Sequence, residues 1–124
     1  TLTRDSLLGT PYLLEFTRLS NTLYQEQYEE LLVIRQLFDA TGLEIVTLAG
    51  DWTPVLRDAF FEERPRLWVF ADSASGGWET AVERFNIEQI PTRLLIDRQG
   101  RIHRKYGPFE LDAILRGVQQ VTAE

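Results

Sequence analysis

The chain alternates between short apolar runs and longer segments in which apolar residues recur every three or four positions. The short runs are typical of buried strands, and the periodic segments are typical of amphipathic helices packed on a sheet. The runs predict strands at residues 12–17, 43–48, 67–71, 92–96 and 101–106. The periodic segments predict helices at about residues 21–41, 54–63, 78–85 and 110–121.

The order of these elements predicts an α/β fold with a central mixed sheet. Strands that alternate with helices pair in parallel, whereas the last two strands are joined by a short turn and pair antiparallel. That turn is Asp97–Gly100, in which Gly100 supplies the positive φ of a tight hairpin.

The first long helix has strong start signals. Ser20, Asn21 and Thr22 are N-cap residues in succession, so the helix begins near Asn21 or Thr22. Thr22 and Gln25 also have the spacing of a capping box. Gly42 is suited to end the helix after about Thr41.

Length and charge exclude several classes of protein. The 124 residues fit a single domain, 1–124, with its core at about 11–122. The net charge of −6 disfavours binding to nucleic acid, and no apolar run approaches the ~18 residues of a membrane span. No signal peptide is visible, and a start at Thr1 is typical of a trimmed chain, a processed chain or one domain of a longer protein.

The chain contains no cysteine and one histidine, His103. Disulfides, thiolate nucleophiles and thiolate metal sites are therefore excluded, and a histidine-based metal site is disfavoured. We expect no metal and no cofactor.

Two neighbouring runs of sequence are specific enough to indicate a family. Ile90-Pro91-Thr92 follows a short helix, and the hairpin Asp97–Gly100 follows at a fixed distance. The combination resembles the thioredoxin superfamily, most closely its TlpA-like branch of extracytoplasmic thiol–disulfide oxidoreductases, over nearly the whole chain. The resemblance implies a thioredoxin-like fold with helices on both faces of the sheet. It also implies a cis proline at Pro91 and a location outside the cytoplasm, periplasmic or membrane-tethered.

The reactive C-x-x-C motif of that family is absent. Alignment on Phe16 puts Asn21 at the first cysteine position and Tyr24 at the second, with Thr22 and Leu23 between them. A helix N-terminus activates a thiol, but asparagine retains only the capping role and tyrosine adds a phenol that cannot cycle electrons. The simpler interpretation is an N-cap followed by a packed aromatic, and a new site at these positions is the alternative.

The recognition surface of the family has counterparts in this sequence. Thioredoxin folds bind extended peptides at the loop before the proline by backbone pairing. The resemblance places a peptide-binding groove at Thr22, Leu23, Gln89, Ile90, Pro91 and Thr92. We expect a redox-inactive module that binds a protein or peptide there. A structural domain of a larger envelope protein remains open, as does an enzyme using Tyr24, Glu15 or His103.

Two further features bear on these alternatives. Glu15 lies where classical thioredoxins carry a buried acid; if it is buried, its neutral form is favoured unless a cation pairs with it. Several basic residues lie near the hairpin: Arg93, Arg98, Arg101, His103, Arg104 and Lys105. They form either a patch for an acidic partner or a solvated strand edge. The solvated edge is the more common arrangement.

Overall fold

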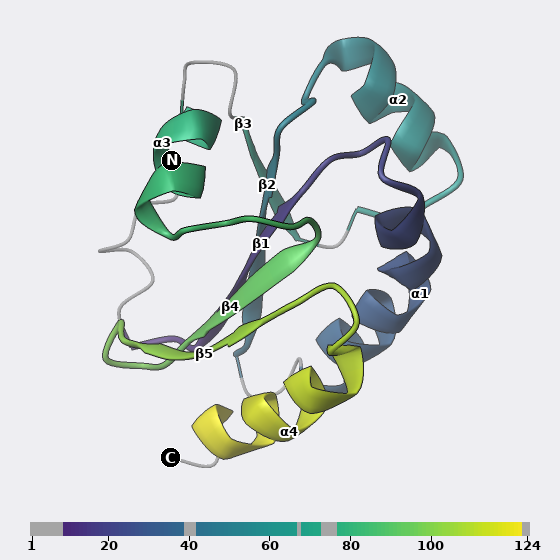
Figure 1. Cartoon of the computed structure of the whole chain (residues 1–124). Coiled ribbons are helices and arrows are strands. Elements are labelled where there is room, and N and C mark those ends of the chain that lie inside the picture. Colours follow the sequence, from purple (N-terminus) through teal and green to yellow (C-terminus); the bar gives the residue numbers. More distant parts are fainter. Residues whose placement is uncertain (1–8, 39–41, 67, 73–76, 123–124) are drawn as a thin grey trace.

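The computed structural model describes residues 9–38, 42–66, 68–72 and 77–122. The strands are β1 (Tyr12–Thr17), β2 (Glu44–Ala49), β3 (Val69–Asp72), β4 (Thr92–Ile96) and β5 (Ile102–Tyr106). The helices are α1 (Thr22–Leu37), α2 (Pro54–Glu62), α3 (Gly77–Arg84) and α4 (Leu111–Thr122). The strands form one sheet in the order β3-β2-β1-β4-β5 (Figure 1).

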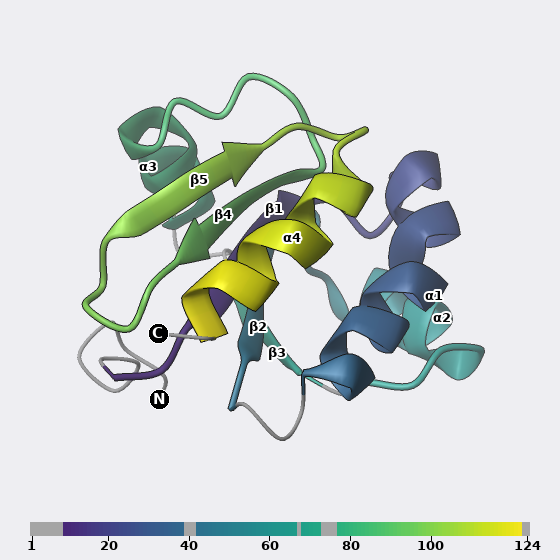
Figure 2. The same cartoon turned by 90° about the horizontal axis from the view of Figure 1, so that it is seen from below.

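The sheet is mixed, as predicted. β1 pairs with β2 and β2 with β3 in parallel, whereas β4 is antiparallel to both β1 and β5. Buried residues of α1, α2 and α4 share one apolar cluster on one face, and α3 packs against a second cluster on the other face (Figure 2). The predicted arrangement of helices on both faces of the sheet is therefore confirmed.

Local signals explain most element boundaries. Asn21 is the N-cap of α1, and its side chain accepts a hydrogen bond from the Tyr24 N–H at 2.8 Å. The predicted capping box is wrong: the Gln25 side chain donates to the carbonyl of Leu19 instead. The helix α1 ends at Leu37, earlier than predicted, and residues 39–41 lie outside the described residues.

The hairpin differs from the prediction in one respect. Gly100 has the expected positive φ of 82°. The pairing of β4 with β5 shifts between Leu95 and Ile96, because residue 103 is an extra residue in β5. A bulge of this kind is set by pairing across the sheet, and the sequence pattern of one strand does not reveal it.

The contact between α4 and β5 requires a glycine. A Cβ atom at Gly117 would overlap the hydroxyl of Tyr106 and lie 3.0 Å from Cδ2 of Leu95. Tyr106 is fully buried, and its hydroxyl has no hydrogen-bond partner among the described residues. The absence of a side chain at residue 117 is what allows this ring to fit under α4.

We expect Gly117→Ala to lower the free energy of unfolding by about 1–3 kcal/mol, although alanine is the better helix former. Tyr106→Phe alone should cost little, because it removes a buried hydroxyl that has no partner. The Gly117→Ala substitution is made both in the wild type and in the Tyr106→Phe variant, and its cost is measured by urea unfolding. The comparison tests whether overlap with the Tyr106 hydroxyl causes the loss of stability. An equal loss in these two backgrounds would show that the hydroxyl contact is not responsible.

Candidate functional site

The positions of the absent C-x-x-C motif, Asn21 to Tyr24, lie at the start of α1, shortly after β1. Asn21 is half-buried and is occupied as the N-cap, since its side-chain oxygen accepts from the Tyr24 N–H. Thr22 is exposed and Leu23 is half-buried. The first turn of α1 contains no acidic residue, so its N–H groups face no side-chain charge of their own helix.

Tyr24, at the second cysteine position, is a core residue with 0% exposure. Its ring stacks on Phe60 at 5.9 Å and meets Tyr28 edge-on at the same separation. Burial, and then the neighbouring Glu15 carboxylate, raise the pKa of Tyr24 well above its usual range. Its hydroxyl therefore acts as a hydrogen-bond donor and not as a nucleophile.

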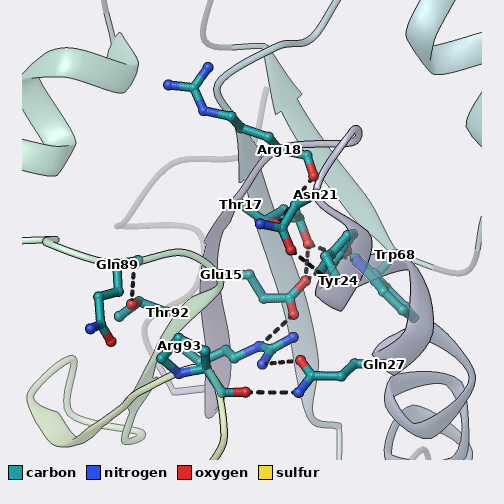
Figure 3. A network of polar contacts seen from close by, with 12 residues as sticks. Glu15, Thr17, Arg18, Asn21, Tyr24, Gln27, Trp68, Gln89, Thr92 and Arg93 are labelled. Atoms are coloured by element: carbon teal, nitrogen blue, oxygen red, sulfur yellow. Dashed lines mark hydrogen bonds and ion pairs between the residues drawn. The ribbon is translucent and has the colours of Figure 1, made fainter.

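The register of the sheet brings three polar residues side by side. Glu15 in β1 lies opposite Thr47 in β2 and opposite Arg93 in β4. The Glu15 carboxylate accepts hydrogen bonds from Thr47 Oγ1 at 2.6 Å, Tyr24 Oη at 3.0 Å and Arg93 Nε at 3.0 Å (Figure 3). Trp68 Nε1 donates to Thr47 Oγ1 at 2.9 Å and extends the network.

Arg93 corrects a prediction. It is not part of an exposed basic cluster: its side chain and that of Glu15 are both 0% exposed and form an ion pair. β4 is buried on both faces, so an arginine there needs a carboxylate opposite it. Arg93 is therefore the cation that pairs with the buried Glu15.

Gln27 links this network to a distant loop. Its side-chain oxygen accepts from Arg93 Nη1 at 2.9 Å, and its amide nitrogen donates to the carbonyl of Pro108 at 2.8 Å. One side chain of α1 thus connects β4 with the segment between β5 and α4. Phe109, next to this contact, is 84% exposed, and no sequence signal marked it.

The loop before β4 lies beside the end of β1, from which the chain runs into α1 (Figure 1). Thr92 pairs with Phe16 at the end of β1, and the Ile90–Pro91 peptide bond is cis, the isomer that the resemblance implies. Pro91 and Thr92 are buried and support the loop, the latter by donating a hydrogen bond to the Gln89 carbonyl. Gln89 is exposed and Ile90 is half-buried, so these two residues present the surface.

Ile90 has free backbone groups. Across residues 9–38, 42–66, 68–72 and 77–122, no hydrogen bond engages its N–H or its C=O. A cavity of about 270 Å³ adjoins the same loop and is lined by residues that include Gln89, Thr92 and Lys105. Thr22 and Leu23 do not line this cavity, so the structure does not join all the predicted peptide-binding residues in one pocket.

Asp51, which sequence reasoning did not assign, fixes the segment before α1. Its carboxylate accepts hydrogen bonds from the Leu19 N–H at 2.6 Å, the Ser20 N–H at 3.1 Å and Ser20 Oγ at 2.8 Å. The available signal is its position just after β2, since the ends of adjacent parallel strands meet at one edge of a sheet.

The remaining basic residues of the hairpin have local contacts. Arg98 Nη1 donates to the carbonyl of Gly9 at 3.3 Å, and Arg101 Nε lies 3.5 Å from the Asp97 carboxylate. His103 lies 3.0 Å from the Gln120 side-chain oxygen, Arg104 pairs with Glu110 at 3.2 Å, and Lys105 donates to the carbonyls of Phe85 and Asn86. Among the described residues, no group of three acidic or histidine side chains is arranged to hold a metal ion.

Comparison with solved structures identifies the fold. No family model and no curated protein matches the sequence. A putative thiol:disulfide interchange protein DsbE from Chlorobium tepidum is 16% identical, with a TM-score of 0.83 over 95% of this chain and 84% of that chain. StoA from Bacillus subtilis is 14% identical, with a TM-score of 0.72 over 90% and 84%.

A third neighbour, DsbF of MTB in mixed oxidized and reduced forms, is 19% identical, with a TM-score of 0.78 over 94% of this chain and 84% of that chain. Identities this low establish the fold alone. The predicted resemblance is confirmed at that level: the protein has the thioredoxin-like fold of thiol:disulfide interchange proteins, and it contains no cysteine.

Proposed function

We propose that this protein is a redox-inactive module that binds an extended segment of a partner protein at the surface of Thr22, Leu23, Gln89 and Ile90. The observation that carries the proposal is the pair of free backbone groups at Ile90. An N–H and a C=O on an exposed loop can pair with an extended chain, as in strand addition. Such pairing requires no thiol.

The buried network supports binding over catalysis by Tyr24 or Glu15, two of the three groups first considered for an enzyme. Tyr24 and Glu15 are fully buried and hydrogen-bonded to each other, so a bound substrate cannot touch either of them. In this chain those positions stabilise the scaffold on which the loop before β4 is held.

We propose further that the protein acts outside the cytoplasm, in line with the TlpA-like resemblance. The fold neighbours include proteins named as thiol:disulfide interchange proteins. None of the helices within the described residues has the length and apolar character needed to cross a membrane.

Titration of ¹⁵N-labelled protein with S-carboxymethylated insulin B chain, an unfolded polypeptide without free thiols, tests the binding proposal. We expect the largest amide shifts at Thr22, Leu23, Gln89 and Ile90. Shifts confined to residues 98–105 would contradict this surface and favour the basic hairpin. An absence of shifts at any concentration reached would favour a purely structural domain.

A pair of matched variants on α1 sharpens the test. Leu23→Asp places a charge on the proposed surface, whereas Val33→Asp places the same charge elsewhere on the same helix, at a residue that is 52% exposed. We expect Leu23→Asp to weaken binding of the probe about tenfold and Val33→Asp to leave it unchanged. Equal effects of the two variants would contradict the location of the surface.

A further inference from the structure

We propose that Arg18 binds an acidic side chain of the extended segment, so that the preferred partner is a peptide with Asp or Glu beside the residues that pair with Ile90. This inference rests on the proposed function and names the substrate class of the same surface. No feature of the sequence pattern had marked Arg18.

Arg18 and Ile90 both lie two residues beyond the last residue pair between β1 and β4. β1 and β4 are antiparallel, with Phe16 opposite Thr92. Extending that register by two residues, past the end of β1 at Thr17, would set Arg18 opposite Ile90. Trp78, over which the Arg18 guanidinium lies, and Ile90 both pack against the apolar cluster that contains Phe16.

Trp78 holds the arginine in place. The guanidinium carbon of Arg18 lies 5.7 Å from the centroid of the Trp78 ring. The indole is itself fixed, because it packs against Phe16 and against the backbone of Gly50, where an added Cβ would lie 2.7 Å from the ring. An arginine held on a fixed ring loses less side-chain entropy when it binds an anion.

The charge of Arg18 is available to a ligand. Arg18 is exposed, and no carboxylate pairs with it in the part of the chain that the structure describes. Figure 3 shows its guanidinium directed away from the buried network. Asp51, the carboxylate bound to the next two residues, is occupied by Leu19 and Ser20.

The start of α1 also favours a negatively charged ligand. The first turn of α1, which begins four residues after Arg18, lacks an acidic side chain, and a helix N-terminus favours negative charge. The protein as a whole carries a net charge of −6, and the exposed guanidinium of Arg18 is a local positive group on this acidic molecule. An acidic side chain is therefore attracted to the Arg18 guanidinium, against the repulsion of the Asp51 carboxylate that is bound to Leu19 and Ser20.

The test uses three blocked heptapeptides of alternating threonine and valine, identical except for Glu, Gln or Lys at the centre. Dissociation constants are measured by fluorescence anisotropy at low salt, with amide shifts to locate binding. We expect the wild-type protein to bind the Glu peptide about fivefold more tightly than the Gln peptide, the range of one exposed ion pair. The Lys peptide should bind most weakly, and the preference should fall with added salt.

Arg18→Gln should abolish the preference for Glu over Gln and leave affinity for the Gln peptide nearly unchanged. Arg116→Gln, at an exposed residue of α4, changes the net charge equally and should retain the preference. Equal binding of the Glu and Gln peptides by the wild type overturns the role of Arg18 while the proposed function stands. Failure of all three peptides to shift Ile90 overturns both.

Discussion

Replacing Arg93 with Met should lower the free energy of unfolding by about 3–5 kcal/mol, because it leaves the buried Glu15 carboxylate without its cation. Both side chains of this pair are 0% exposed, so water cannot solvate the charge that remains. Thermal or urea unfolding measures the loss. Arg116→Met removes an exposed arginine instead and should change stability by no more than about 0.5 kcal/mol.

A second substitution separates the ion pair from simple loss of packing. Glu15→Gln keeps a side-chain oxygen that can accept from Tyr24 and Thr47 but carries no charge. In that background Arg93→Met should cost much less than in the wild type, because no buried charge is left unpaired. The same cost in both backgrounds would mean that the arginine stabilises the core through its hydrocarbon chain alone.

Introducing Asn21→Cys together with Tyr24→Cys should convert a chain without thiol chemistry into one that closes a disulfide. The two positions are the N-cap and the third residue of α1, one helical turn apart. Such a spacing meets the Cα separation of about 4.4–6.8 Å that a disulfide needs. The thiol at residue 21 should have a pKa below the free value of about 8.5, since it lies at a helix N-terminus.

The measurements are disulfide formation in a glutathione gradient and thiol reactivity against pH. Asn21→Cys with Tyr28→Cys is the matched control: it also removes a buried tyrosine of α1, but its two thiols are separated by about 10 Å along the helix and cannot bridge. Each loss of a buried ring should cost about 3–5 kcal/mol. Failure of residues 21 and 24 to pair in the folded protein would refute the assignment of the motif positions.

Most of the fold could be predicted from the sequence, because its signals are local. β1 and β4 begin and end where the apolar runs predicted, and Asn21 and Thr53 cap α1 and α2 through their own side chains. The remaining helix and strand ends within the described residues match the prediction or differ from it by small shifts, apart from the earlier end of α1. Such shifts are expected where tertiary packing and not a local cap decides the boundary.

The site was less predictable, since its chemistry depends on which strands become neighbours. Arg93 looks like one more basic residue of a hairpin until the register sets it opposite Glu15, 78 positions away. Asp51 has no partner within its own segment, and its carboxylate acts on residues 31 and 32 positions earlier. Contacts over such distances follow from topology, which the pattern along a single strand does not encode.

The ion pair of Glu15 and Arg93 also constrains how this chain can change over evolutionary time. A cysteine at residue 24 removes one of the three donors to the Glu15 carboxylate, but Thr47 and Arg93 still bind it, so cysteines alone would not free this acid to assist a thiol. Releasing Glu15 requires loss of Arg93, and that step alone leaves a buried charge without a partner. Any route by single substitutions to an assisted dithiol therefore passes through a weakened protein, which makes that chemistry hard for this chain to acquire. An arginine directly after an Ile-Pro-Thr run, with a glutamate in the first strand, would mark other chains of this fold that have the same constraint.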